Sequence, residues 1–133
     1  MASVVIDTSA VLAVLLNEPE RPALISVTSG VDLAGAPSLP WEVGNALVAG
    51  VRKHRLSAAD VRSAWASYQE VPIRLLRIDA LRALSVALDA GLYAYDGYVL
   101  EAARSGRLPL LTLDRRLARA AERLGVRIME FES

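Results

Sequence analysis

A strand pattern that stops at an aspartate and is followed by apolar residues at helical spacing occurs three times in this chain. The apolar run at residues 4–6 ends at Asp7, the strand expected at 73–78 ends at Asp79, and the short apolar strand expected at 108–113 ends at Asp114. Continuous Val/Ile/Leu runs bounded by polar residues are typical of strands that are covered on both faces, as in parallel sheets. The pattern therefore predicts buried parallel strands, each followed by a helix.

The remaining residues continue this alternation of strands and helices. Weaker strands are expected at 31–34 and 127–131. Helices are expected at 20–28, from Pro40 onward, from Ser57 towards Glu70, at 80–90, from Asp96 to about Gly106, and at 115–124. Asp60 is the expected capping partner of Ser57, and Leu81, Leu84 and Leu88 are the apolar positions of the helix at 80–90. Such alternation predicts a three-layer α/β sandwich with a central parallel sheet and right-handed crossovers. A length of 133 residues predicts one domain spanning residues 1–133.

Composition adds an expectation about partners. Apolar residues make up 53% of the chain and charged residues only 23%, which is richer in apolar groups than an average soluble domain. We therefore expect another chain to cover part of the surface, as a homodimer or a bound partner. The sequence has no apolar stretch of about 18 residues and no signal-peptide pattern, so we expect a soluble, cytoplasmic protein without a membrane.

The charges and the missing cysteines limit the chemistry. The chain has no cysteine, which excludes disulfides, zinc–thiolate sites and thiol nucleophiles. Positive and negative side chains balance at 15 each, so any attraction for a nucleic acid must come from a local patch. The candidate chemistry is therefore based on oxygen ligands.

Five acidic residues precede or begin predicted helices. An aspartate at such a position can simply cap the helix, which is worth about 1 kcal/mol, and a glutamate in the first turn complements the helix dipole. Acids at the carboxyl ends of neighbouring parallel strands would also share one crevice, where they repel one another unless a divalent cation joins them. A magnesium-like site suits phosphodiester hydrolysis. The pattern alone does not choose among Asp7, Glu42, Asp79, Asp96 and Asp114, and it does not give the strand order.

Four segments, in this order along the chain, resemble a PIN-domain nuclease, and the chain's length and lack of extensions resemble the VapC toxins of VapBC toxin–antitoxin systems. The segments are residues 4–10, Glu42 with Asn45, Tyr95 and Asp96 with residues 100–103, and residues 111–114. The resemblance implies the strand order 3-2-1-4-5, which brings the strands before Asp7 and Asp114 side by side. It places the strand before Asp79 at an edge, so Asp79 becomes a helix cap.

The resemblance also implies roles for individual residues. An acidic cluster that holds Mg²⁺ or Mn²⁺ would consist of Asp7, Glu42, Asp96 and Asp114, with Asp7 and Asp96 as the strongest metal ligands. Ser9 would steady Asp7 or a phosphate, Thr112 would do the same beside Asp114, and Asn45 would orient Glu42. Many relatives carry a further acid where Arg115 and Arg116 stand here, which argues against a second ion and suggests contacts with RNA phosphate.

The function that follows is a metal-dependent endoribonuclease that acts as the toxin of a toxin–antitoxin pair, with RNA as substrate and a VapB-like antitoxin as partner. Three alternatives stay open at this stage. The first is an RNA-processing nuclease without an antitoxin, and the second is a noncatalytic interaction module whose acids are only caps. The third is a phosphatase or phosphotransfer domain with Asp7 as nucleophile, which the serine at position 9 and the absence of a late lysine disfavour.

Overall fold

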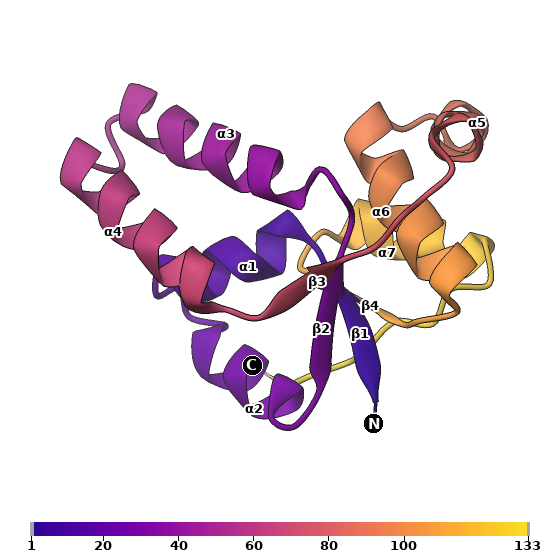
Figure 1. Ribbon diagram of the computed structural model, residues 1–133, viewed down its shortest axis with the longest axis horizontal. Helices are drawn as coiled ribbons and strands as arrows, with labels where there is room; N and C mark the ends of the chain where they lie inside the picture. The colour runs from indigo at the N-terminus through magenta and orange to yellow at the C-terminus, as the bar shows by residue number, and fades with distance from the viewer. Residues whose placement is uncertain (1, 133) are drawn as a thin grey trace.

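The computed structural model describes residues 2–132, which form a parallel β-sheet with helices on both faces (Figure 1). The order of its four strands is β3-β2-β1-β4, so the predicted three-layer α/β fold is confirmed. The strands are β1 (Ser3–Ile6), β2 (Asp32–Gly35), β3 (Ile73–Leu75) and β4 (Leu110–Leu111); the helices are α1 (Thr8–Leu15), α2 (Arg21–Thr28), α3 (Leu39–Arg52), α4 (Ala58–Glu70), α5 (Ala80–Ala90), α6 (Ala94–Gly106) and α7 (Arg115–Arg123).

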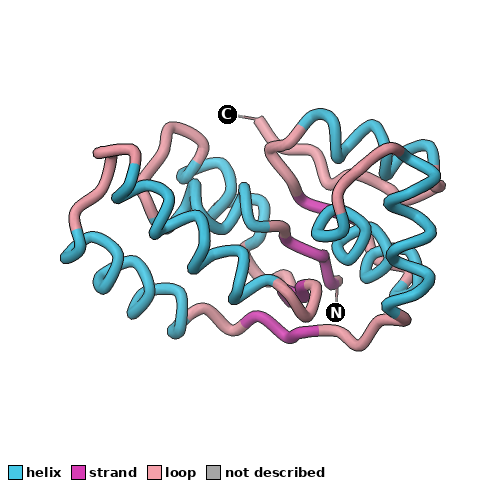
Figure 2. The backbone as a smooth tube through the Cα atoms, turned by 90° about the horizontal axis from the view of Figure 1, so that it is seen from above, coloured by secondary structure: helices cyan, strands magenta, loops and turns pink. Residues whose placement is uncertain are grey.

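Strand β1 lies at the centre of the molecule and separates two hydrophobic cores. Successive side chains of a strand point to opposite faces of a sheet. Val4 and Ile6 pack with α1 to α4, whereas Val5 packs with α6 and α7. Viewed from above, α3 and α4 lie on one side of the sheet and α5 and α6 on the other (Figure 2). Burial on both faces explains why residues 4–6 are an unbroken apolar run.

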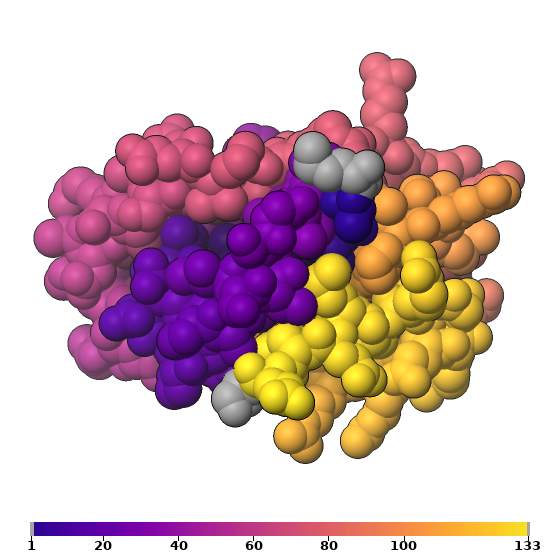
Figure 3. Space-filling view, turned by 90° about the horizontal axis from the view of Figure 1, so that it is seen from below, coloured from indigo at the N-terminus to yellow at the C-terminus, as the bar shows by residue number. Residues whose placement is uncertain are grey.

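The sheet is smaller than the sequence predicts. The strand expected at 73–78 ends at Leu75, and the one expected at 108–113 is reduced to β4. Residues 127–131 lie beside β4, as the order 3-2-1-4-5 requires, but they contribute only an isolated parallel bridge between Ile128 and Leu110. The space-filling view shows this C-terminal segment against the N-terminal half of the chain (Figure 3), where Met129 and Phe131 pack beside α1 and α2.

Helix α5 turns its small residues inward and its large apolar residues outward. Ala83 and Ala87 are buried, while Leu81, Leu84 and Leu88 on the other side are exposed, Leu88 by 81%. The reason is a close approach between α5 and α6 at Gly97, where a Cβ atom would lie 2.4 Å from the carbonyl oxygen of Ala83. Leucines would not fit between the two helices, so they form an apolar stripe on the surface.

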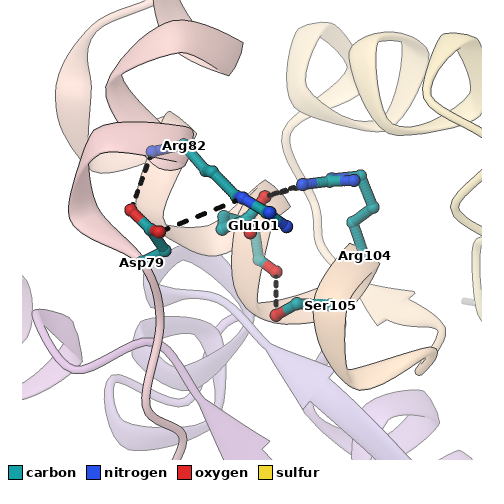
Figure 4. A network of polar contacts seen from close by, with 5 residues as sticks. All are labelled: Asp79, Arg82, Glu101, Arg104 and Ser105. Carbon is teal, nitrogen blue, oxygen red and sulfur yellow. Dashed lines mark hydrogen bonds and ion pairs between the residues drawn. The ribbon is translucent and has the colours of Figure 1, made fainter.

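Several predicted helix ends are confirmed. Ser57 and Asp60 form the expected capping box at the start of α4. Asp79 caps α5 by accepting a hydrogen bond from the backbone N–H of Arg82 (3.1 Å), and its carboxylate also lies 3.9 Å from the Arg82 guanidinium (Figure 4).

Within residues 2–132, no helix has both the length and the apolar character needed to cross a membrane.

Candidate functional site

Four acidic side chains lie at the N-terminal ends of four helices. Asp7 follows β1 and caps α1, and Asp114 follows β4 and caps α7. Glu42 is in the first turn of α3, and Asp96 is in the first turn of α6. Helix N-termini carry a partial positive charge, which lowers the cost of gathering carboxylates there. The strand–aspartate–helix pattern thus presents Asp7 and Asp114 at the carboxyl edge of the sheet, and the first turns of α3 and α6 supply Glu42 and Asp96.

Asp7 is the most firmly held of the four. It is only 5% exposed, and its Oδ1 atom accepts hydrogen bonds from the Ser9 hydroxyl (2.7 Å) and the Ala10 amide (3.1 Å). Its Oδ2 atom accepts a third from the Thr112 hydroxyl (2.6 Å), which in turn accepts from the Asp114 amide (3.0 Å). Ser9 and Thr112, both chosen from the sequence, therefore tie β1 to the loop after β4. Thr112 acts on the Asp7 side chain and on the backbone of Asp114.

Glu42 is positioned by a residue that the sequence reasoning missed. The Ser38 hydroxyl, just before α3, donates to Glu42 Oε2 at 2.8 Å. Asn45, the expected orienting residue, is exposed and makes no hydrogen bond to Glu42 in residues 2–132. A hydroxyl four residues before an acid at a helix start was a usable signal, because such residues are one helical turn apart.

The pKa values indicate that the four acids are close in space. Burial raises the pKa of Asp7 above its ordinary value, and the Asp114 carboxylate raises it further. Burial also raises the pKa of Glu42, with smaller increases from Asp7 and Asp96. The pKa of Asp96 is raised by burial and by Asp114, and is lowered by the Arg116 guanidinium. Each acid thus repels at least two of the other three, as expected for a shared cluster.

These raised pKa values predict a pH dependence for the metal-free protein. A carboxyl group whose pKa is higher in the folded state binds more protons when folded, so the free energy of unfolding falls as the pH rises from the ordinary value of 3.8 through the raised value. Unfolding by urea in a chelator should detect this loss. Asp7→Asn, which removes the buried charge, should increase stability more at about pH 7 than at about pH 5. An equal change at both pH values would contradict the assignment.

The two arginines at the start of α7 are exposed beside the cluster. Arg116 Nη2 lies 3.7 Å from Asp96 Oδ2, which is a loose ion pair, and Arg115 is also exposed.

Glu101, on α6, is buried but pairs with Arg104 at 2.6 Å, so its charge is already balanced (Figure 4). Asp79 is engaged in capping α5 and contributes to none of the raised pKa values of the cluster.

The residues present fit a hard divalent cation. All candidate ligands in the cluster are oxygen atoms, the type that Mg²⁺ and Mn²⁺ prefer. In residues 2–132 no three Asp, Glu or His side chains converge as the ligands of one ion, so direct contact is limited to one or two carboxylates. That matches magnesium, which usually keeps several waters.

Comparison with known proteins points to one family. Residues 4–123 match the model of the PIN domain family. The fold is similar to the crystal structure of PAE2754 from Pyrobaculum aerophilum, with a TM-score of 0.68 and 23% identity over 93% of this chain and 90% of that one. It is also similar to a toxin–antitoxin complex from Klebsiella pneumoniae, with a TM-score of 0.52 and 16% identity over 84% of this chain and 86% of that one. No curated protein sequence matches the chain.

Proposed function

This chain belongs to the PIN-domain family, a nuclease superfamily, and from that premise we propose that it is an endoribonuclease that depends on Mg²⁺ or Mn²⁺. The observation that carries the proposal is the cluster of Asp7, Glu42, Asp96 and Asp114, in which burial and repulsion by neighbouring carboxylates raise the pKa values of Asp7, Glu42 and Asp96. Such a cluster costs stability in a metal-free protein. A divalent cation would remove that cost and would bring an anionic substrate to the same edge of the sheet.

Each residue has a distinct part in the proposed hydrolysis. Asp7 and Asp96 would hold the ion, and Asp114 would contact it through a bound water, because no three carboxylates in residues 2–132 converge on one ion. The bound ion would activate a water molecule and offset charge on the phosphate. Glu42 would accept a proton from the attacking water, because burial brings its pKa closer to neutral pH, where a general base works best. Ser38 and Thr112 are positioning residues that keep Glu42 and Asp7 in place.

Arg115 and Arg116 would bind the phosphate of the substrate. Both are exposed at the first turn of α7, next to the cluster. At 3.7 Å the contact of Arg116 with Asp96 is longer than a hydrogen bond, so the guanidinium can turn to a phosphate oxygen at little cost. Contacts of this kind position a nucleic acid without reading its sequence.

The proposal is tested with the purified protein, a fluorescently labelled RNA and a DNA strand of the same sequence. We expect cleavage of the RNA with Mg²⁺ or Mn²⁺, none in a chelator, and recovery when the ion is restored. Cleavage that continues unchanged in the chelator would contradict the role of the cluster. Cleavage of the DNA alone would contradict the choice of substrate.

We further propose that the enzyme is a toxin and that an antitoxin protein is its partner. One similar structure is a toxin–antitoxin complex, which supports this role. An apolar pocket of about 190 Å³ lies between α1, α2 and the sheet, with Val11, Leu15, Leu24 and Ile25 in its lining, and could receive an apolar side chain of such a partner. The exposed leucines of α5 support a homodimer, which sedimentation would reveal as twice the chain mass of 14.3 kDa.

A further inference from the structure

Two large aromatic side chains are exposed immediately beside the acidic cluster. Trp41, directly before Glu42 on α3, is 71% exposed, and Tyr95, directly before Asp96 on α6, is 51% exposed. Large aromatic rings contribute most to stability when they are buried. The fold makes no such use of these two rings, although both stand next to proposed catalytic residues.

Both rings line a single hollow of about 380 Å³ between the starts of α3 and α6. Pro37, Ile78, Ala80 and Tyr98 complete its apolar lining. Tyr98 packs against the hydrophobic core and meets Tyr95 edge-on, with ring centroids 6.0 Å apart and an angle of 70° between the rings. Tyr95 therefore rests on an anchored neighbour, and one side of the hollow is held in place.

Ser38 connects this hollow to the acidic cluster. It lines the hollow and donates a hydrogen bond to Glu42 at 2.8 Å. A flat group seated between Trp41 and Tyr95 would thus lie next to the carboxylates. The size is within the range of about 300–1,000 Å³ that is usual for pockets binding small ligands.

The chemistry of the hollow suits an unpaired nucleobase. Aromatic side chains stack on bases that are not paired, at about 1–3 kcal/mol for each base, and they do so with little dependence on sequence. Without the ion, the neighbouring carboxylates repel the phosphate backbone of RNA, so an attraction that does not depend on charge would add to the contacts of the arginines. Stacking supplies that attraction, and a paired base inside a helix cannot reach the rings.

We propose that Trp41 and Tyr95 form a stacking subsite for one unpaired base next to the scissile phosphate. This inference rests on the proposed nuclease function and adds to it the two side chains that hold the base. The subsite binds a base whether or not the divalent ion is present, because stacking needs no metal.

Binding is measured in a chelator, where no cleavage occurs. The chain has two tryptophans, Trp41 and Trp65. In a Trp65→Phe protein the tryptophan fluorescence comes from Trp41 alone and reports on the hollow. A short single-stranded RNA should quench this fluorescence. A strand of the same length and charge that lacks bases should not, and neither should the same RNA in a perfect duplex. Equal quenching by the duplex or by the strand without bases would overturn the subsite.

Kinetics of the metal-loaded protein give a second readout. Trp41→Ala should raise KM for single-stranded RNA by about tenfold or more, with kcat changed by less than about threefold, and Trp41→Phe should retain most of the affinity. Val48→Ala, a truncation of another exposed apolar side chain on α3, is the matched control and should change neither constant.

The outcomes separate this inference from the proposed function. Normal kinetics in Trp41→Ala together with no quenching would overturn the subsite and leave the nuclease standing. A wild-type protein that cuts no RNA would defeat the proposed function, whereas quenching in the chelator would still support the subsite. Dissociation of a dimer by Trp41→Ala, without quenching by RNA, would assign the hollow to a second copy of the chain and would also overturn the subsite.

Discussion

The Asp96→Asn protein is expected to cleave RNA more slowly than the wild type by on the order of a hundredfold or more, while it folds normally. Within residues 2–132, Asp96 accepts no hydrogen bond from the backbone, and its one ion pair there is the loose one with Arg116. Burial and the Asp114 carboxylate already raise its pKa, so a neutral side chain is tolerated at this position. The substitution should therefore remove an ion ligand and little else.

Asp79→Asn is the matched control for this experiment. Asp79 also stands at the start of a helix, and asparagine caps helices about as well as aspartate does. The cleavage rates of both variants are measured with saturating Mg²⁺, at a temperature at which thermal unfolding shows that both proteins are fully folded. Similar losses in the two variants would mean that the effect comes from the helix ends and not from the cluster. Full activity in Asp96→Asn would remove Asp96 from the site.

Gly97→Ala should produce the largest loss of stability among substitutions of one small residue for another. The added Cβ would meet the Ala83 carbonyl oxygen at 2.4 Å and the Ala87 Cβ at 2.9 Å, so α6 must move away from α5. Overpacking of this kind costs about 1–3 kcal/mol of the free energy of unfolding. Because Asp96 is the preceding residue on α6, cleavage should fall as well.

Gly44→Ala separates this steric effect from helix propensity. Gly44 lies inside α3, and a Cβ atom there would meet nothing within 4 Å. Alanine is favoured over glycine in a helix by roughly 0.5–1 kcal/mol, so Gly44→Ala should leave stability unchanged or increase it. Urea unfolding of both proteins measures the difference. A Gly97→Ala protein as stable as Gly44→Ala would contradict the close contact between α5 and α6.

The parts of the fold that depend on local pattern could be predicted from the sequence. The apolar run before Asp7, buried on both faces, and the capping pair Ser57 and Asp60 have the same form in the sequence as in the structure. The strand at 73–78 was predicted too long, because edge strand β3 pairs with β2 over three residues only. The outward leucines of α5 depend on how closely two helices approach, which periodicity does not report.

The candidate site was predictable in its acids but not in their surroundings. From the residues alone Asp79 could not be separated from Asp7, Glu42, Asp96 and Asp114, since all five stand at helix starts, and the resemblance to a family was needed to choose. Ser38 was missed although its position one helical turn before Glu42 was a usable signal. Trp41 was missed because its place in the hollow depends on the approach of the starts of α3 and α6. Such contacts join residues far apart in the chain, and no spacing rule applies to them.

We propose that one divalent ion relieves the repulsion among carboxylates brought together from four helix starts. This proposal is tested by titrating the metal-free protein with Mn²⁺ in a calorimeter at neutral pH. We expect saturable binding by the wild type and by Asp79→Asn, with affinity reduced by about tenfold or more in Asp7→Asn and in Asp96→Asn. No binding by the wild type, or equal affinity in all four proteins, would contradict it.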